Sequence, residues 1–263
     1  MSRPIARIAS FGARDLARSR WLIAYAGFFM ATTWALLRFS DTETKALLGL
    51  VNVVLFVVPL ANVVFGAMYL YGAREFVELL LAQPIPRRQL YTGLYLGLTS
   101  PVALAALIGI GVPLAMHGAS HDTMRAAGVL AAMTIALSAT FSGIAAVIAY
   151  RIEDRVRGLA LALGVWLMLA VVYDGLVLML ATQFADYPLE RPILALMVVN
   201  PIDLARLILL LQFDVAALLG YTGAVFQRFF EGPLGLAIAA GALVLWIAVP
   251  AIVGARLFHR KDF

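Results

Sequence analysis

The sequence predicts an all-α polytopic membrane protein that crosses the bilayer with six helices. Its 263 residues are 63% hydrophobic and only 13% charged, and the mean hydropathy is +0.94. Such a chain needs a solvent that accepts apolar side chains on every face of a helix, which excludes a soluble globular protein. The apolar runs do not alternate at period two, so the strands of a membrane barrel are excluded as well.

Several kinds of chemistry are excluded by the residues that the chain lacks. It has no cysteine, which excludes disulfides and thiolate metal sites. The lysines are Lys45 and Lys261, and neither lies in the glycine context of a phosphate-binding loop. The sequence has neither H-E-x-x-H nor G-x-S-x-G. We therefore expect no catalytic residue, no metal, no cofactor and no enzyme activity in this chain; any nucleotide energy must come from another polypeptide.

Six apolar stretches are long enough to cross a hydrocarbon core, which takes about 20 helical residues. They run approximately from Trp21 to Leu37, Ala46 to Leu70, Leu94 to Met116, Ala126 to Tyr150, Leu159 to Thr182 and Leu234 to Ala255. A cleaved signal peptide is the alternative for the first stretch, but no small-residue cleavage site follows it, which favours a retained span.

The basic residues predict the orientation, because cytoplasmic loops carry an excess of Lys and Arg. Most of the 20 Lys and Arg residues lie before the first span, in the second and fourth loops and in the tail. The others are Arg38, Lys45, Arg125, Arg191, Arg206 and Arg228. Both termini are therefore expected in the cytoplasm. The net charge of +5 does not indicate nucleic acid, because the basic residues form no patch with interleaved aromatics.

Residues 5–20 predict an amphipathic helix that lies on the inner membrane surface. One helical face carries Ile5, Ile8, Ala9, Gly12, Leu16 and Ala17, and arginines surround it. Such a helix directs its arginines toward anionic lipid. The alternative is a charged flank that only stops translocation.

The second loop, residues 71–93, predicts a short helix that docks on another protein. A charged and Leu-rich half is followed by prolines, which end a helix, and by an arginine pair. The residues concerned are Arg74, Glu75, Glu78, Leu79, Leu80, Pro84, Arg87 and Arg88. The fourth loop adds charges of both signs at Glu153, Asp154 and Arg155. Ordinary solvated loops remain the alternative.

Residues 183–233 form the longest extracytoplasmic segment, which is mostly apolar but too broken for a clean span. We expect helices that dip part-way into the membrane or lie on it; two further spans are the alternative. Within the segment, Asn200 and Pro201 are typical of a helix start, and Asp203 complements the helix dipole. Capping alone explains these residues, and a binding role would be additional.

Asp174 is an ionisable residue inside the fifth predicted span, which makes it a functional candidate. It either contacts a substrate route or forms a structural pair with an arginine such as Arg206, and pairing is favoured. Asn52 and Asn62 are expected to form hydrogen bonds between helices. The predicted third loop, on the outer side, carries thioether and imidazole side chains that could bind copper. The residues are Met116, His117, His121, Asp122 and Met124. The alternative is that they are ordinary loop residues.

These features together resemble the membrane subunit of an ABC-2 type transporter, over essentially the whole chain. The resemblance is carried by six spans, the N-terminal helix, REFVELLLAQPIPR between the second and third spans, and the terminal ARLFHRKDF. It implies the type V ABC exporter fold, with 5–20 as the elbow helix and the second and fourth loops as coupling segments for an ATPase. Two features that are usual in the family are absent: the Gly-Thr of the coupling helix, and a lysine at the start of the third span, where this chain has Leu94.

Three motifs resemble the permeases that serve copper-site maturation of nitrous oxide reductase: REFVELLLAQPI, VYDG at 172–175 and NPIDLARL at 200–207. This resemblance implies a bacterial inner-membrane complex of two permeases, two cytoplasmic ATPases and a periplasmic partner. In it, Asp174, Asn200, Asp203 and Arg206 are candidates for a relay to that partner. A general exporter of lipid, glycan or drug and an energy-independent membrane scaffold are the alternatives.

Overall fold

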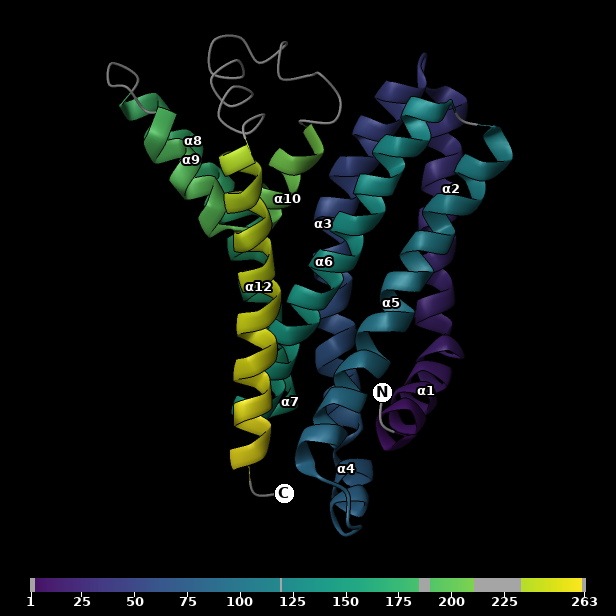
Figure 1. The fold of residues 1–263 in the computed structure, drawn as a ribbon, viewed down its shortest axis with the longest axis vertical. Coiled ribbons are helices and arrows are strands. Elements are labelled where there is room, and N and C mark those ends of the chain that lie inside the picture. Colours follow the sequence, from purple (N-terminus) through teal and green to yellow (C-terminus); the bar gives the residue numbers. More distant parts are fainter. Residues whose placement is uncertain (1–2, 119, 185–189, 211–232, 262–263) are drawn as a thin grey trace.

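A computed structural model describes residues 3–118, 120–184, 190–210 and 233–261, and no strand occurs in these ranges. Within them, six helical stretches are long and apolar enough to cross a membrane. The prediction of an all-α polytopic membrane protein is therefore confirmed. Figure 1 shows these helices as a bundle, with both chain ends and α4 toward the same end.

The first half of the bundle contains α1 (Arg3–Ala17), α2 (Arg20–Phe39), α3 (Glu43–Gly72), α4 (Arg74–Leu81), α5 (Arg87–His117) and α6 (His121–Arg151). The second half contains α7 (Arg155–Leu167), the π-helical turn η1 (Met168–Val172), α8 (Tyr173–Gln183), α9 (Glu190–Val199), α10 (Pro201–Leu210) and α12 (Pro233–Arg260). The stretch α7, η1 and α8 forms one candidate span of 29 residues.

Most of the membrane helices extend beyond the apolar stretches that predicted them. The third span begins at Arg87, directly after Pro86, whose fixed φ suits a helix start. The fourth begins at His121, where the Ser120 side chain accepts a hydrogen bond from the Thr123 amide. Hydropathy detects the part of a helix that lies in lipid, whereas proline and capping residues determine where the helix ends.

The core lies where α6 packs against α3, α5 and α12. Leu130, Leu137 and Phe141 of α6 are completely buried there. One polar network crosses this core: Asn62 of α3 donates to Ser138 Oγ at 3.2 Å and accepts from Ser142 at 3.2 Å. The prediction that Asn62 bonds across helices is confirmed.

For Asn52 the same prediction is wrong. Its amide donates at 3.2 Å to the Leu48 carbonyl of its own helix, and the residue is exposed. No side chain among the described residues accepts from the Asn52 amide, so the preceding turn of its own helix satisfies it.

The N-terminal helix α1 packs against the beginning of α5. Ile8 is buried, and a Cβ at Gly93 would lie 2.7 Å from Ile8 Cβ, while one at Gly97 would lie 3.1 Å from the Ala9 carbonyl oxygen. The GxxxG spacing of Gly93 and Gly97 thus allows the two backbones to approach closely. The apolar face expected for residues 5–20 is turned toward the bundle at Ile8 and Gly12.

The helices α9 and α10 have 10 residues each, about 15 Å at 1.5 Å per residue, which is too short to cross the hydrocarbon core. In Figure 1, α9 runs back beside α8 and α10 turns again toward the end of the bundle opposite α4. Much of the segment predicted at 183–233, namely 185–189 and 211–232, lies outside the described residues.

Candidate functional site

The helix α4 has one face against the bundle and one face free. Val77 is only 3% exposed, whereas Leu79 is 70% exposed. Glu75 and Glu78 are exposed on the same side as Leu79, as the spacing i, i+3, i+4 requires. An exposed leucine beside two carboxylates on one helix face is the kind of surface that a protein partner covers.

Arg74 connects α4 to the loop between α6 and α7. Its Nη2 donates at 3.3 Å to the Ile152 carbonyl oxygen, which also accepts from Tyr71 Oη at 2.9 Å. The guanidinium lies 5.0 Å from the centroid of the Tyr71 ring, in the geometry of a cation–π contact. The second and fourth loops, which the sequence treated separately, are therefore joined through one carbonyl.

The fourth loop presents its charges to solvent. Glu153, Asp154 and Arg155 are exposed, and Val156 is 75% exposed. Asp154 Oδ1 also accepts from the Arg157 amide at 2.7 Å, which caps α7. We define the candidate docking surface by these exposed residues of the two loops: Glu75, Glu78, Leu79, Pro84, Arg88, Glu153, Asp154, Arg155 and Val156.

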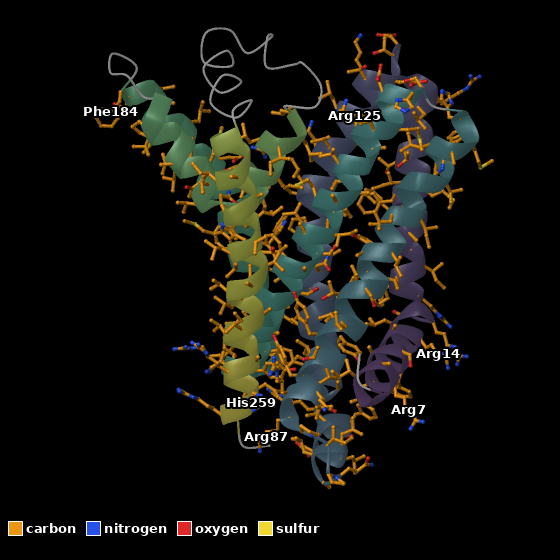
Figure 2. The ribbon with its side chains drawn as sticks, viewed as in Figure 1. Arg7, Arg14, Arg87, Arg125, Phe184 and His259 are labelled. Atoms are coloured by element: carbon orange, nitrogen blue, oxygen red, sulfur yellow. The ribbon has the colours of Figure 1, made fainter. Side chains whose placement is uncertain are left out.

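Two candidate residues of the second loop are directed elsewhere. Leu80 is half-buried. Arg87 donates through Nη1 to the carbonyl oxygens of His259 at 2.9 Å and Lys261 at 3.1 Å, and Figure 2 shows Arg87 and His259 at the same end of the bundle. Arg87 therefore holds the end of α12 against the start of α5.

Sequence reasoning used the C-terminal tail for its charge and for the family resemblance, and missed its contacts. Lys261 Nζ donates at 3.4 Å to the Tyr150 carbonyl oxygen at the end of α6. Partial burial lowers the pKa of Lys261, and the nearby positive charge of Arg74 lowers it further. The tail thus belongs to the same electrostatic environment as the second loop.

Phe11 of α1 stacks on Phe76 of α4, with ring centroids 5.1 Å apart and planes 18° apart. This offset-stacking range is favourable for aromatic pairs. Sequence reasoning could not predict this stack, because Phe11 lies outside the apolar face of the N-terminal helix. It links α1 directly to α4, the helix that carries part of the candidate docking surface.

A second cluster lies where α8 and α10 meet, well away from α4. Arg206 Nη1 is 2.8 Å from Asp174 Oδ2 and 3.1 Å from Asp203 Oδ1. The pair between Asp174 and Arg206 that the sequence suggested is therefore present, and Arg206 bridges two carboxylates. Asp203 is 5% exposed, which explains why it needs both Arg206 and a hydrogen bond from Asn200 at 3.0 Å.

Asn200 is completely buried and binds two elements at once. Its Oδ1 accepts from the Ile202 amide at 3.0 Å, the expected cap at the start of α10. Its Nδ2 donates at 2.7 Å to the Leu169 carbonyl oxygen in η1. Because π-helical turns are rare and have no composition signal, the sequence could not predict this partner.

Contacts between neighbouring helices hold α9 in place. Tyr173 Oη of α8 donates at 2.7 Å to the Leu196 carbonyl oxygen of α9. Trp246 Nε1 of α12 donates at 3.3 Å to the Val198 carbonyl oxygen of α9. The position of α9 and α10 is therefore determined by the fifth and sixth spans together.

A cavity of about 420 Å³ adjoins this cluster. Arg206 and Asn52 are its polar lining residues; the others are Phe28, Val53, Leu55, Phe56, Val57, Ala170 and Ile202. A cation that bridges two carboxylates beside a cavity has room to change partners.

The loop residues His117, His121 and Asp122, which were considered for copper, form no group of three metal-binding side chains. Among the described residues, no group of three His, Cys, Asp or Glu side chains is close enough to hold a metal ion. Glu43 instead accepts hydrogen bonds from Ser120 Oγ at 2.8 Å and from Thr123 Oγ1, which joins the starts of α3 and α6. Met116 is 83% exposed.

Comparison with known proteins places these features in a family. The profile described as "ABC-2 family transporter protein" matches residues 28–263. The chain is 27% identical over 264 residues to the "Probable ABC transporter permease protein NosY" of Pseudomonas aeruginosa, covering 94% of each chain. It is also 27% identical over 265 residues to the protein of that name from Stutzerimonas stutzeri, covering 94% of this chain and 95% of the relative.

The fold and this match agree. In the family, the membrane chain is the transport subunit and a separate subunit hydrolyses ATP. Six spanning helices, an N-terminal helix packed on the third span and a short helix between the second and third spans are all present. The chain belongs to the ABC-2 family of transporter proteins, as a multi-pass membrane permease.

Proposed function

We propose that this permease works as a homodimer in the bacterial inner membrane, with both termini in the cytoplasm, and couples a cytoplasmic ATPase to an extracytoplasmic maturation step. The step is copper-site assembly of nitrous oxide reductase, through a periplasmic partner protein. The similarity to permeases named NosY over 94% of the chain supports this choice within the family.

The observation that carries the coupling proposal is the joint between the two loops at Ile152. Arg74 and Tyr71 both donate to its carbonyl oxygen, so α4 and the start of α7 move together. An ATPase that contacts Glu78 and Leu79 displaces α4, and the fifth span follows through this joint. Coupling of this kind requires two packed elements with two discrete arrangements.

The same fifth span leads to the cluster of Asp174, Asp203 and Arg206, which we propose as the relay on the outer side. Arg206 has two acceptors at 2.8 and 3.1 Å, so a shift of α8 against α10 changes which carboxylate it favours. Charged side chains in lipid persist only when they are paired. An exchange of Arg206 between its two carboxylates therefore has two stable arrangements, as a two-state element requires. The static alternative is that the cluster only holds the helices together.

The test is to delete the gene for this chain and follow the copper sites of nitrous oxide reductase by their visible absorption spectrum. Loss of those sites, with the apoenzyme still exported, supports the proposal. An intact copper spectrum, with an accumulated lipid or glycan, supports a general exporter instead. Co-purification with an ATPase separates either function from an energy-independent scaffold.

A further inference from the structure

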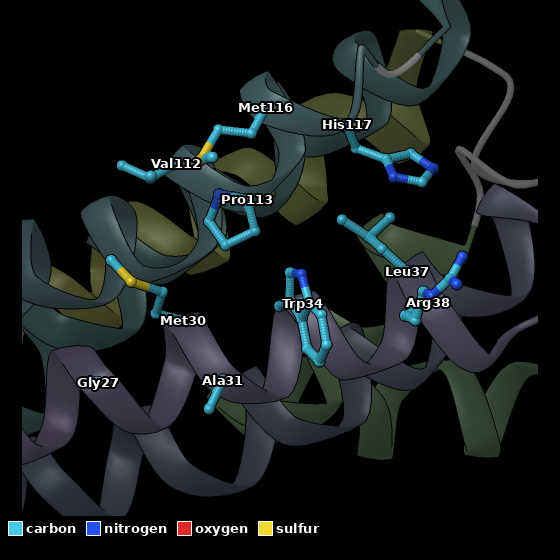
Figure 3. Close-up of a pocket in the computed structure, with 10 residues that line it drawn as sticks. All are labelled: Gly27, Met30, Ala31, Trp34, Leu37, Arg38, Val112, Pro113, Met116 and His117. Carbon is cyan, nitrogen blue, oxygen red and sulfur yellow. The ribbon is translucent and has the colours of Figure 1, made fainter.

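A cleft between α2 and α5, at the end of the bundle opposite α4, has no part in the proposed function. Its volume is about 550 Å³, within the range of small-molecule sites. Figure 3 shows the ten lining residues: Gly27, Met30, Ala31, Trp34, Leu37, Arg38, Val112, Pro113, Met116 and His117. The two walls belong to the first and third spans.

Most of the cleft is apolar. Met30 and Trp34 line one wall and Val112 and Pro113 the other, and Trp34 is 59% exposed. Gly27 keeps the far part of the cleft open, since a Cβ added there would meet nothing within 4 Å. A long hydrocarbon chain is the kind of ligand that suits such an apolar cleft between two spans.

One end of the cleft is cationic. Figure 3 shows Arg38 and His117 at this end, on opposite walls. Arg38 is exposed and has no hydrogen bond or ion pair with any other described residue. The acidic residues next along the chain are already bound, because Asp41 pairs with Lys45 at 2.6 Å and Glu43 accepts from Ser120 and Thr123. The Arg38 guanidinium therefore has a free donor set for an anion.

We propose that the cleft binds one anionic phospholipid of the surrounding bilayer, with an acyl chain along Met30 and Trp34 and the phosphate at Arg38. Arginine is the side chain whose fork best matches a phosphate group, and the apolar length of the cleft favours a ligand that carries an acyl chain over a free phosphate ion. In the proposed orientation the lipid belongs to the outer leaflet. The site does not depend on the maturation function.

The experiment is lipid retention by the complex of permease and ATPase, measured by native mass spectrometry after release from bilayers of equal phosphatidylglycerol and phosphatidylcholine. The wild type should retain phosphatidylglycerol in preference to phosphatidylcholine. Replacing Arg38→Gln should reduce its retention about tenfold, since it removes a charge-assisted hydrogen bond. Arg125→Gln, an exposed arginine outside the cleft, is the control and should retain the lipid.

A second pair of variants tests the apolar part. Gly27→Leu fills the cleft from a position with free space, and Gly111→Leu makes the same change on α5 where a Cβ also meets nothing within 4 Å. Only Gly27→Leu should lose the lipid. Equal retention of both lipids by the wild type, full retention by Arg38→Gln, or equal loss in both leucine variants would each overturn the proposal. A failed maturation function leaves this measurement unchanged.

Discussion

The Asn200 side chain donates a 2.7 Å hydrogen bond to the Leu169 carbonyl oxygen, from the start of α10 to the π-helical turn of the fifth span. A π-helical turn shifts the backbone ladder and tends to occur at functional positions. Because the same side chain caps α10 through the Ile202 amide, one residue holds both the irregular turn and the helix that carries Arg206.

Replacing Asn200→Ala should destabilise the permease by about 1–3 kcal/mol, since it leaves the half-buried Leu169 carbonyl and the buried Ile202 amide without this partner. Thermal unfolding in detergent measures the change. The matched control is Asn52→Ala, whose exposed amide bonds only to its own helix at Leu48 and which should change stability by about 0.5 kcal/mol or less. Equal losses of stability in the two variants would show that the hydrogen bond to Leu169 does not contribute to the stability of the permease.

Asp174→Asn keeps the shape of the side chain and removes its charge. If the relay operates, the variant should assemble with the ATPase and hydrolyse ATP but fail to support copper-site maturation. Asp41→Asn is the control, since Asp41 forms an exposed pair with Lys45, worth about 0–1 kcal/mol. Dissociation of the Asp174→Asn complex in detergent would make the residue structural, and wild-type behaviour in every assay would exclude both roles.

Glu78→Arg reverses a charge on the free face of α4 and should weaken or uncouple the ATPase, since charge complementarity governs docking. Co-purification and ATP hydrolysis are the measurements. Asp122→Arg makes the same reversal at an exposed residue near the opposite end of the bundle and should leave both unchanged. Normal assembly and maturation with Glu78→Arg would place the ATPase elsewhere.

Gly158→Ala should destabilise the joint between the loops, because a Cβ at this position would collide with the Tyr71 hydroxyl that donates to Ile152. We expect a loss of about 1–3 kcal/mol in unfolding free energy, as for other overpacked sites. Gly164→Ala in the same helix meets nothing within 4 Å and should be neutral or gain up to about 1 kcal/mol. A neutral Gly158→Ala would mean that Tyr71 moves aside freely.

The mass of the detergent-solubilised complex should correspond to two permease chains with two ATPases. The fifth span has 0% of its most apolar window buried within the chain, so it offers a free apolar surface to a second copy. A closed pair with twofold symmetry also matches the two equivalent faces of an ATPase dimer. A single permease chain per two ATPases would disprove the homodimer.

The sequence predicted well what depends on local pattern. All six spans, the short helix after Tyr71, the cap at Asn200 and the pair between Asp174 and Arg206 follow from hydropathy, proline position and the cost of a charge in lipid. Each of these signals is contained in a few neighbouring residues or in a charge that must find a partner.

Other features depend on which helix faces meet, and the sequence did not reveal them. The Phe11 and Phe76 stack, the bonds from Arg87 to the tail and the partner of Asn200 all join residues far apart in the chain. Asn52 was assigned to a helix interface because an amide in a span usually bonds across one. Uniformly apolar helices have no periodicity that distinguishes the face toward lipid or a cavity from the face toward protein.

The close packing of α1 on Gly93 and Gly97 of α5 also imposes an order on biosynthesis. The helix α1 leaves the ribosome before the third span, whose surface receives it, and chains are made at about 5–20 residues per second. During that interval its apolar face has only the membrane surface to cover it. We therefore expect the nascent chain to hold α1 at the lipid headgroups until the third span is inserted, after which α1 moves onto the bundle.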